Sequence, residues 1–491
     1  MAATAPGLTL ASSPTSRRQR DTMDQSLQER LRLVLEQQRA AFDANRMPRL
    51  AERRDRLERL GRLTTTHRAE LQAAMAQDFG HRAHQESLLA DIFTVESGVR
   101  HALKHLKSWM ATKRAPTALH FLPGRNRLMP QPLGVVGIVS PWNYPYYLAM
   151  APALAALAAG NRVMIKPSEL TPATSALMAR LVAEHFAPEE MTVLTGDADV
   201  GRAFTELPFD HLFFTGSTPV GRVVAQAAAR NLTPVTLELG GKSPVVIDRS
   251  ADLAQAAERI AFGKLLNAGQ TCVAPDYALV PRESVAAFTE AVLAAIRRLY
   301  PQIDGNPDYT AIVSPRHHAR LLALVEEARE QGATVRRSHD ESPQDRRLVP
   351  TVLLDTRATM TVMREEIFGP LLPIVPYDQP ADAVRHINAG DRPLALYWFG
   401  RDDAARDQVL AQTHAGGVTI NDCLWHLGQE EQPFGGVGAS GMGAYHGVWG
   451  FNTFSKLKPV FYQSALAGTR LFYPPYGPRF DRLMALMRKI A

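Results

Sequence analysis

The spacing of apolar residues divides the chain into a helical first part and a longer second part with a different pattern. Between residues 24 and 112, apolar side chains recur every three or four positions, as at Leu57, Leu60 and Leu63, and this period predicts amphipathic helices. The following segment, 115–132, contains four prolines, which favour an extended arm or a hairpin over a helix.

From Pro132 onward, short apolar runs alternate with amphipathic segments in two successive series. In the first series the predicted strands are 134–139, 163–166, 192–194, 211–215 and 235–239, and the predicted helices are 148–159, 173–185 and 218–231. In the second, after Gly241, the predicted strands are 245–248, 277–280, 372–375, 394–399 and 417–420, and the predicted helices are 252–266, 284–299, 315–331 and 403–413. Such alternation is typical of βαβ units, so we expect an α/β protein with two doubly wound parallel sheets.

The same patterns predict where the domains begin and end. We expect a disordered tail in 1–23, a first α/β domain in 24–114 and 133–240, a second in 241–430, a small β arm in 115–132 and 453–462, and a C-terminal tail in 463–491. Segment 453–462 is predicted to be an exposed strand that is suited to pairing with another subunit.

The composition is that of an ordinary globular protein. Of the 491 residues, 45% are hydrophobic and 21% are charged, which excludes a collagen-like chain, and the two cysteines exclude a framework of several disulfides. The formal net charge is +6, but no basic tract is interleaved with aromatic residues, so no nucleic-acid partner is expected. The longest apolar stretch, 147–159, is too short to span a bilayer, and no secretory signal is evident. We therefore expect a cytoplasmic protein with no membrane partner.

Cys272 is the first residue with candidate chemistry. It lies in the segment Asn267-Ala-Gly-Gln-Thr-Cys-Val, where Gly269 permits a close backbone approach and the polar residues before the cysteine indicate a loop at a cleft. A thiolate is a strong nucleophile when a base or a positive dipole lies nearby. Free cysteines are also among the most buried residues, so an inert core thiol is the alternative.

Two further polar residues stand at or near the ends of predicted strands. Glu238 lies within an apolar strand, where a partly buried carboxyl acquires a raised pKa and can act as a general base; a solvent-facing position is the alternative. Asn143 lies between Pro141 and Pro145 after the strand 134–139, where its amide can donate to an oxyanion; an asparagine that only supports a turn is the alternative.

Two glycine-containing segments give different signals. Gly216 ends one strand and precedes a helix, so it can support a pyrophosphate at the positive helix end, with a plain strand–helix turn as the alternative. The segment Gly436–Gly441 matches G-x-G-x-x-G, but too little chain follows it for a Rossmann unit, so we interpret it as a tight loop against the cleft. No cluster of His, Cys and Asp has the spacing of a metal site, and no metal is predicted.

Seven segments taken together resemble the signature blocks of the NAD(P)-dependent aldehyde dehydrogenases. They occur in the family's order and span about residues 24–462. The segments are Pro141-Trp-Asn-Tyr-Pro145, Lys166-Pro-Ser-Glu169, Phe214-Thr-Gly-Ser217, Leu237-Glu-Leu-Gly-Gly-Lys242, Gly269-Gln-Thr-Cys272, Glu365-Glu-Ile-Phe-Gly-Pro370 and Pro433-Phe-Gly-Gly436. Within the family, 433–447 resembles the class 3 branch, and 269–277 is similar to the bacterial coniferyl aldehyde dehydrogenases.

The resemblance implies both a fold and a reaction. The fold would be aldehyde dehydrogenase-like, with a dinucleotide-binding first domain, a second domain that carries the thiol, and an oligomerisation arm. In the reaction, Cys272 would attack the aldehyde and form a thiohemiacetal, which hydride transfer to the cofactor turns into a thioester. Asn143 and the Cys272 backbone N–H would stabilise the oxyanion, and Glu238 would activate the water that releases the acid.

The resemblance also implies the cofactor site. Its residues are Lys166 and Glu169 at the adenosine ribose, Gly216 and Ser217 at the pyrophosphate, Glu366 at the nicotinamide ribose, and Phe368 beside the nicotinamide ring. A carboxylate at Glu169 repels a 2′-phosphate, so we expect NAD to be the preferred cofactor, with NADP also accepted.

The substrate prediction rests on aromatic residues that flank the predicted cleft. They are Trp142, Tyr144, Tyr146, Tyr147, Trp425 and His426. Aromatic walls suit a flat apolar aldehyde such as coniferyl aldehyde, although ordinary core packing would explain the same residues. The alternatives are a medium- or long-chain aliphatic aldehyde as substrate, or a cofactor-independent thiol hydrolase. The class 3 resemblance implies a homodimer.

Overall fold

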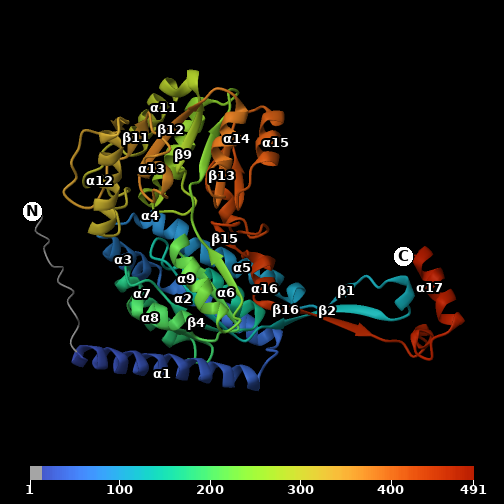
Figure 1. The fold of residues 1–491 in the computed structure, drawn as a ribbon. Helices are drawn as coiled ribbons and strands as arrows, with labels where there is room; N and C mark the ends of the chain where they lie inside the picture. The colour runs from blue at the N-terminus through green and yellow to red at the C-terminus, as the bar shows by residue number, and fades with distance from the viewer. Residues whose placement is uncertain (1–13, 491) are drawn as a thin grey trace, which may run out of the picture.

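The computed structural model describes the backbone of residues 14–490 and the side chains of residues 26–489. Two helix-covered sheets form two lobes, and a long antiparallel arm projects away from one of them (Figure 1). This is the α/β architecture that the alternation of apolar runs and amphipathic segments predicts. Among the described residues, no helix combines the length and the apolar character that a membrane span requires.

The first lobe is built on a six-stranded sheet with the order β15-β7-β6-β3-β4-β5. Its strands are β3 (Val135–Val139), β4 (Arg162–Lys166), β5 (Met191–Val193), β6 (His211–Thr215), β7 (Val235–Glu238) and β15 (Gly441–Met442). β3 to β7 run parallel to one another, whereas β15 pairs antiparallel with β7. The sheet is a doubly wound parallel sheet with one short antiparallel edge strand.

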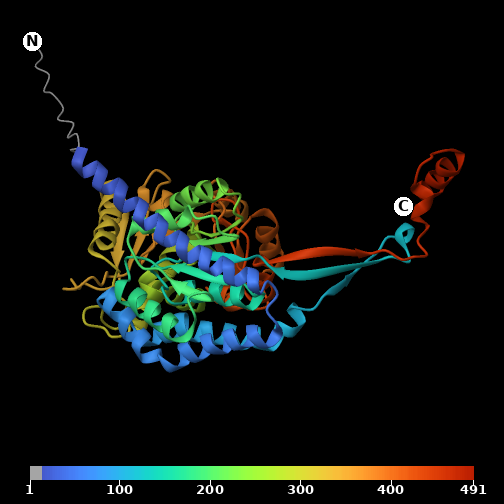
Figure 2. The ribbon, with the colours of Figure 1, turned by 90° about the horizontal axis from the view of Figure 1, so that it is seen from below.

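The helices of this lobe come from the first 110 residues and from the βαβ crossovers. They are α1 (Pro14–Ala44), α2 (Leu50–Thr66), α3 (Arg68–Phe79), α4 (His84–Ser87), the π-helix η1 (Leu88–Phe93), α5 (Thr94–Trp109), α6 (Tyr147–Ala159), α7 (Pro172–His185), α8 (Ala198–Thr205) and α9 (Thr218–Ala229). α1 lies across the lobe as one long rod (Figure 2). α6 is almost completely buried, as expected for a helix that is apolar on all sides.

The second lobe is built on a seven-stranded sheet with the order β10-β11-β12-β9-β8-β13-β14. Its strands are β8 (Pro244–Ile247), β9 (Tyr277–Pro281), β10 (Thr334–Arg337), β11 (Thr351–Leu354), β12 (Leu371–Tyr377), β13 (Ala395–Phe399) and β14 (Gly417–Ile420). Its helices are α10 (Leu253–Leu265), α11 (Val285–Leu299), α12 (Pro315–Glu330), α13 (Thr361–Arg364), α14 (Pro380–Asn388) and α15 (Asp403–Gln412). All pairs in the sheet are parallel except β10 with β11.

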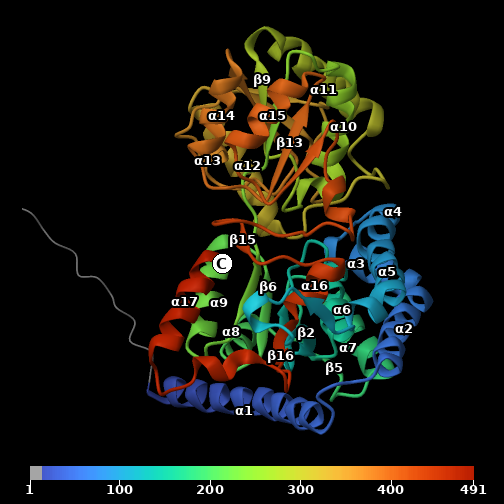
Figure 3. The same ribbon diagram turned by 90° about the vertical axis from the view of Figure 1, so that its right-hand side faces the viewer.

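The two lobes share one apolar core. Val136 and Ile165 of the first sheet belong to the same buried cluster as Val245 and Ile374 of the second. Seen along the arm, the lobes stand one above the other, and the segment around β15 lies at their junction (Figure 3). Because buried apolar contacts continue from lobe to lobe, the cleft between them has a defined shape.

The arm is a three-stranded antiparallel sheet formed by segments from both halves of the chain. It consists of β1 (Lys113–Ala115), β2 (Arg125–Pro132) and β16 (Ser455–Tyr462), with β2 in the middle. β2 and β16 pair over eight positions, from Ser455 opposite Pro132 to Tyr462 opposite Arg125. Leu457, Phe461 and Tyr462 are exposed on β16, so the arm presents apolar side chains to its surroundings.

The structure differs from the predicted tails at both ends of the chain. α1 begins at Pro14, so residues 14–23 belong to a helix, while residues 1–13 lie outside the described residues. A helix that is anchored by the buried Leu31 and Leu35 extends at little cost once it is nucleated. The predicted tail 463–491 contains the short η6 (Gly468–Phe472) and α17 (Pro478–Ile490), whose charged residues obscure the helical spacing of the apolar ones.

A buried ion pair joins the helical layer to the loop after β3. Arg82 Nη2 donates to Asp91 Oδ2 at 2.8 Å, and both side chains are fully buried. The other carboxylate oxygen of Asp91 accepts the backbone N–H groups of Tyr146 and Tyr147 at 3.1 and 3.0 Å. Arg82 Nη1 donates to the backbone oxygen of Asn143 at 3.2 Å. The pair therefore fixes the loop that runs into α6.

We expect Asp91→Asn to lower the free energy of unfolding by about 3–5 kcal/mol, because it leaves the Arg82 charge buried without a counterion. Urea unfolding followed by tryptophan fluorescence measures the change. The control is Glu326→Gln, which breaks an exposed pair with Arg329 and should cost less than about 1 kcal/mol. Equal losses in the two variants would contradict the role of the buried pair.

Candidate active site

A cavity of about 1000 Å³ opens at the carboxyl ends of β6 and β7, between the two lobes. Of the residues predicted from the sequence, Asn143, Gly216, Ser217, Glu238, Cys272, Glu366 and Phe368 line it. This edge of a parallel sheet is where open α/β folds bind their ligands. The fold therefore brings together side chains that are more than 200 positions apart in the sequence.

A second, smaller cavity of about 210 Å³ meets the first one at Cys272, which lines both. Its wall is mostly apolar and aromatic, with Tyr144, Tyr147, Phe262, Trp425, Phe434 and Tyr445 among the lining residues. The thiol is thus accessible from two separate spaces, so a different molecule can reach it from each. The fully buried Cys423, in contrast, lines neither cavity.

The loop before Cys272 is strained and held by hydrogen bonds. Asn267 adopts a φ of 54°, in the left-handed region that residues other than glycine rarely occupy. The Gln270 side chain donates to the carbonyl oxygens of Asn267 and Ala311 at 3.0 and 3.1 Å. Its Oε1 accepts the N–H of Val313 at 2.9 Å. The thiol therefore follows a fixed loop and not a mobile one.

Asn143 lies beside this loop and is almost fully buried. Its side-chain Nδ2 donates to the carbonyl oxygen of Gln270 at 3.1 Å. Its own carbonyl oxygen accepts from the side chain of Asn267 at 3.0 Å. The amide is thereby held next to the residues that precede Cys272, on the wall of the large cavity.

Glu238 is the last residue of β7, and its side chain is buried instead of facing solvent. Neither carboxylate oxygen has a hydrogen-bond partner among the described residues. Burial raises the pKa of Glu238 well above its ordinary value, because the charged form loses its hydration. The group combines the basicity and the free lone pairs that a general base needs.

The Gly436–Gly441 segment packs against the strand that carries Glu238. Gly441 pairs with Glu238 in the antiparallel β15–β7 ladder. A Cβ atom at Gly441 would lie 2.2 Å from the carbonyl oxygen of Leu237, so a larger residue cannot take its place. The segment is a tight loop beside the site and not the start of a Rossmann unit.

The environment of Cys272 keeps the thiol protonated in this state of the protein. Burial raises the pKa of Cys272 to about 12, and the negative charges of the nearby carboxyls of Glu366 and Glu238 contribute to this increase. A thiol in such a place becomes nucleophilic when its proton is taken up by a base as the new bond forms.

Glu366 projects against the pair of glycines that follows β7. A Cβ atom at Gly240 would lie 2.3 Å from Glu366 Oε2, so the glycine makes room for the carboxyl. Burial raises the pKa of Glu366 to about 8, and its Oε1 has no partner among the described residues. Phe368 contacts Trp142 edge to face, with 5.3 Å between the ring centroids.

Charged residues that the sequence analysis did not single out hold this segment in place. Lys242 Nζ donates to Asp276 Oδ1 at 2.7 Å and to the backbone oxygen of Glu365 at 2.9 Å. Arg320 donates to the backbone oxygen of Glu366 at 2.7 Å. Their partners lie 34 or more positions away, so no local pattern in the sequence could reveal these contacts.

The start of α9 forms another part of the cavity wall. Ser217 is the N-cap residue of α9, and its hydroxyl makes no capping hydrogen bond. The first N–H groups of the helix and its positive end therefore suit a phosphate group. Gly216 precedes Ser217 on the cavity wall, and its N–H donates to the backbone oxygen of Glu238 at 3.0 Å.

Lys166 and Glu169 stand apart from the other predicted cofactor residues and do not line the large cavity. Lys166 is buried at the end of β4, where its Nζ donates to the backbone oxygen of Pro167 at 2.7 Å. Glu169 Oε2 lies 3.8 Å from that Nζ, and its side chain is 47% exposed. Lys166 is the last residue of β4 and Glu169 follows it, so both lie along the same sheet edge as the cavity.

The donor set along this edge fits a dinucleotide. The cavity is at the upper end of the about 300–1000 Å³ range of small-molecule sites. The start of α9, which has no side-chain cap, has the chemistry to hold a pyrophosphate, and the unpartnered oxygen of Glu366 is able to accept a hydrogen bond from a ribose hydroxyl. Lys166 and Glu169 offer a second pair of polar groups further along the edge.

The predicted aromatic wall is correct in part. Tyr144, Tyr147 and Trp425 line the small cavity, and Trp142 lines the large one. Tyr146 is fully buried against Thr64, with 2.6 Å between the two hydroxyl oxygens, so core packing explains it. The small cavity also contains Tyr445 and His446, which no sequence pattern had indicated.

One group of side chains outside both cavities has the composition of a metal site, although no metal is predicted from the sequence. His101, His105 and Glu431 place three ligand-type atoms within 4.8 Å of one another, outside both cavities. The sequence analysis missed this group because Glu431 is remote from the two histidines in the chain.

Comparisons with known proteins show the family to which this chain belongs. The model of the aldehyde dehydrogenase family matches residues 9–460. A Pseudomonas aeruginosa protein named probable coniferyl aldehyde dehydrogenase is 49% identical over 94% of this chain and 97% of its own. Two solved structures are similar: the substrate-bound state of Staphylococcus aureus AldH has a TM-score of 0.89 and 37% identity, covering 93% of this chain and 99% of that one. The NAD⁺ complex of aldehyde dehydrogenase from Bacillus cereus has a TM-score of 0.80 and 29% identity, covering 89% of each chain. This chain therefore belongs to the aldehyde dehydrogenase family, the NAD(P)-dependent enzymes that oxidise aldehydes to carboxylic acids.

Proposed function

We propose that Cys272, Asn143 and Glu238 carry out the aldehyde oxidation of this enzyme as nucleophile, oxyanion donor and general base. The observation that supports this assignment best is that Cys272 lines both cavities. An aldehyde in the small cavity and a dinucleotide in the large one then meet at the same sulfur. Asn143 and Glu238 lie on the wall of the large cavity together with it.

In the first half-reaction, the sulfur of Cys272 forms a bond to the carbonyl carbon. The thiol proton leaves to a base, and the carbonyl oxygen becomes an oxyanion that the Asn143 amide and the Cys272 backbone N–H stabilise. One such donor is worth about 3–4 kcal/mol in related chemistry. Bound NAD(P) supplies the acceptor for the hydride whose loss turns the thiohemiacetal into a thioester.

In the second half-reaction, Glu238 takes a proton from a water molecule whose oxygen attacks the thioester carbon. The carbon–sulfur bond breaks, the carboxylic acid leaves, and the sulfur regains a proton. The raised pKa of Glu238 supports this role, since a more basic carboxylate is a better proton acceptor near neutral pH.

The cofactor assignment follows the same edge of the sheet. We assign Ser217 and the start of α9 to the pyrophosphate with Gly216 as the turn before them, Glu366 to the nicotinamide ribose, Phe368 to the side of the ring, and Lys166 and Glu169 to the adenosine ribose. The half-exposed carboxylate of Glu169 disfavours a 2′-phosphate by charge repulsion, which supports a preference for NAD over NADP.

Cys272→Ala is expected to abolish NAD reduction with every aldehyde, because the variant lacks the atom that makes the carbonyl carbon tetrahedral. Absorbance at the NADH band measures the rate. Cys423→Ala is the matched control, since Cys423 is fully buried and lines neither cavity. Activity that survives in Cys272→Ala would contradict the mechanism.

Glu238→Gln separates the two half-reactions in the same assay. We expect one equivalent of NADH to form in the first turnover and the steady-state rate to fall by about 10²–10⁴-fold, because the thioester can form but cannot be hydrolysed quickly. Loss of the first-turnover NADH would assign Glu238 to the first half-reaction instead.

Glu169→Gln is expected to raise kcat/KM for NADP about tenfold and to change kcat/KM for NAD much less, because it removes a negative charge from the adenosine ribose site. Steady-state kinetics with each cofactor at a saturating aldehyde concentration gives the ratio. The control is Glu184→Gln, whose side chain has a similar exposure of 45%. A wild-type enzyme that already prefers NADP would contradict the assignment.

We further propose that the substrate is an aromatic aldehyde, with coniferyl aldehyde as the leading candidate. The aromatic lining of the small cavity and the name of the Pseudomonas aeruginosa relative support this choice. The cavity volume of about 210 Å³ suits one ring with a short side chain better than a long aliphatic chain. The carboxyl of Glu430 on the same wall offers an acceptor for a phenolic hydroxyl.

Coniferyl aldehyde is expected to be oxidised with a kcat/KM at least about tenfold above that for acetaldehyde, because the ring contacts contribute to binding in the transition state. Trp425→Ala should reduce this ratio by about tenfold or more, since Trp425 lines the cavity and lies against Phe262. Trp449→Ala, another half-exposed tryptophan that lines neither cavity, is the control. Turnover of acetaldehyde but not of coniferyl aldehyde would overturn the assignment.

A homodimer in the cytoplasm completes the proposal. The arm projects away from both lobes and exposes apolar side chains on β16, which supports its use as a subunit contact (Figure 1). Both cysteines are free thiols, which supports a reducing compartment such as the cytoplasm.

A further inference from the structure

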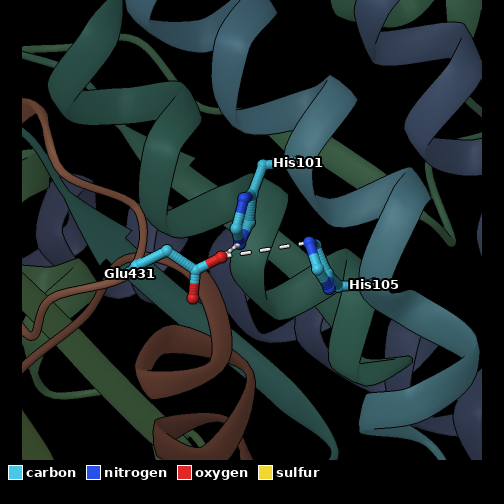
Figure 4. Close-up of side chains that lie close together, drawn as sticks. All are labelled: His101, His105 and Glu431. Atoms are coloured by element: carbon cyan, nitrogen blue, oxygen red, sulfur yellow. Dashed lines mark ion pairs between the residues drawn. The ribbon is translucent and has the colours of Figure 1, made fainter.

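Three ligand-type side chains converge between α5 and the segment that follows the short helix Trp425–Gly428. His101 and His105 project from one face of α5, and Glu431 faces them from the opposite segment (Figure 4). The Nε2 atoms of the two histidines lie 3.8 and 3.9 Å from the same carboxylate oxygen, Oε1 of Glu431. The group lies outside the two cavities described above.

We propose that His101, His105 and Glu431 form a binding site for a divalent transition-metal ion such as Zn²⁺. Imidazole nitrogen and carboxylate oxygen are common zinc ligands, and three protein ligands leave a fourth position for water. Ligand atoms about 2.0–2.2 Å from a tetrahedral ion lie about 3.3–3.6 Å apart. The two observed nitrogen–oxygen separations of 3.8 and 3.9 Å need to shorten by a few tenths of an ångström, and all three ligand atoms lie within 4.8 Å of one another.

Hydrogen bonding alone does not explain this arrangement. Both nitrogen–oxygen distances, 3.8 and 3.9 Å, exceed the length of a hydrogen bond. A simple pair, such as His67 with Glu70, closes to 2.6 Å in the same protein. Two imidazoles that face one carboxylate oxygen without contact leave a gap between them that suits an ion.

The helix fixes the two histidines in advance. Residues four positions apart lie on the same helix face, and the two rings stand 4.6 Å apart between centroids. Trp109 packs against both rings, at 5.6 and 6.0 Å, and restricts their rotamers. The side chain of Glu431 is 77% exposed, so it can move toward an ion, and the ion can enter from solvent.

A bound ion would fasten a wall of the small cavity. Glu430, the neighbour of Glu431, lines that cavity and accepts the N–H of Gly447 at 2.9 Å. Ser97 of α5 lines the same cavity. The ion would therefore link two elements of the cavity wall. This consequence rests on the proposed function of the cavity, whereas the metal site itself does not.

The test is a calorimetric titration of the full chain with Zn²⁺ in a Cys272→Ser background, which removes the accessible thiol as a competing ligand. We expect one ion per chain. Glu431→Gln and His105→Ala should each raise the Kd for Zn²⁺ at least about tenfold, since even the loss of a residue that only supports a ligand has an effect of this size. Glu431→Gln alters an exposed side chain and is not expected to disturb the fold.

Glu70→Gln is the matched control. In the described structure the Glu70 carboxyl lies beside a single histidine, His67, and so lacks the second imidazole of the proposed site. It should leave the Kd for Zn²⁺ unchanged.

Titration with Co²⁺ provides a spectroscopic check: visible bands of a nitrogen- and oxygen-bound ion are expected, without a sulfur charge-transfer band. Absence of binding, or a Kd that neither Glu431→Gln nor His105→Ala alters, would overturn the proposal. Aldehyde oxidation by the Cys272-containing enzyme is assayed separately, so failure of the metal site and failure of the proposed function are distinguishable.

Discussion

The site depends on the hydrogen bonds that hold the loop before Cys272. Asn267 and Ala268 adopt left-handed backbone conformations, each of which costs about 1–3 kcal/mol. Three hydrogen bonds of the buried Gln270 side chain, to backbone groups of the loop and of residues 311 and 313, offset this strain. Without them the loop would relax, and the sulfur would no longer lie on the wall that the two cavities share.

Burial also determines the electrostatics of the acidic groups around the large cavity. Glu238, Glu366 and Cys272 are acidic groups gathered in one poorly hydrated place, and each has a raised pKa chiefly because burial penalises its charged form. The ammonium group of the buried Lys264 has the opposite shift, with its pKa lowered to about 8. Burial thus favours the neutral forms of these groups, whereas charged side chains such as Lys242 and Arg320 line other parts of the cavity wall. Such a setting suits a reaction that removes a proton from a thiol and later from water.

The sequence predicted the parts of the fold that have a strong local signal. The alternation of apolar runs located the parallel strands around the site within one or two residues, as for His211–Thr215. It missed β10 (Thr334–Arg337), an edge strand in which Val335 is the only apolar residue. It also missed the neighbouring β11 (Thr351–Leu354), whose apolar run is only three residues long. Family motifs located Cys272, Glu238 and Asn143, but the residues that hold them, such as Gln270 and Lys242, act through long-range contacts that leave no local pattern.

The segment 428–447 contacts both the small cavity and the strand β7. Between residues 428 and 447 the chain returns from the second lobe and lies along the junction (Figure 3). It places Glu430 and Tyr445 on the wall of the small cavity, and it pairs Gly441 with Glu238 on β7. These contacts lie on one short and continuous stretch that begins close to Glu431, so the same backbone contributes to the small cavity and to the edge of the first sheet. The segment therefore links the wall of the small cavity to the strand that carries Glu238.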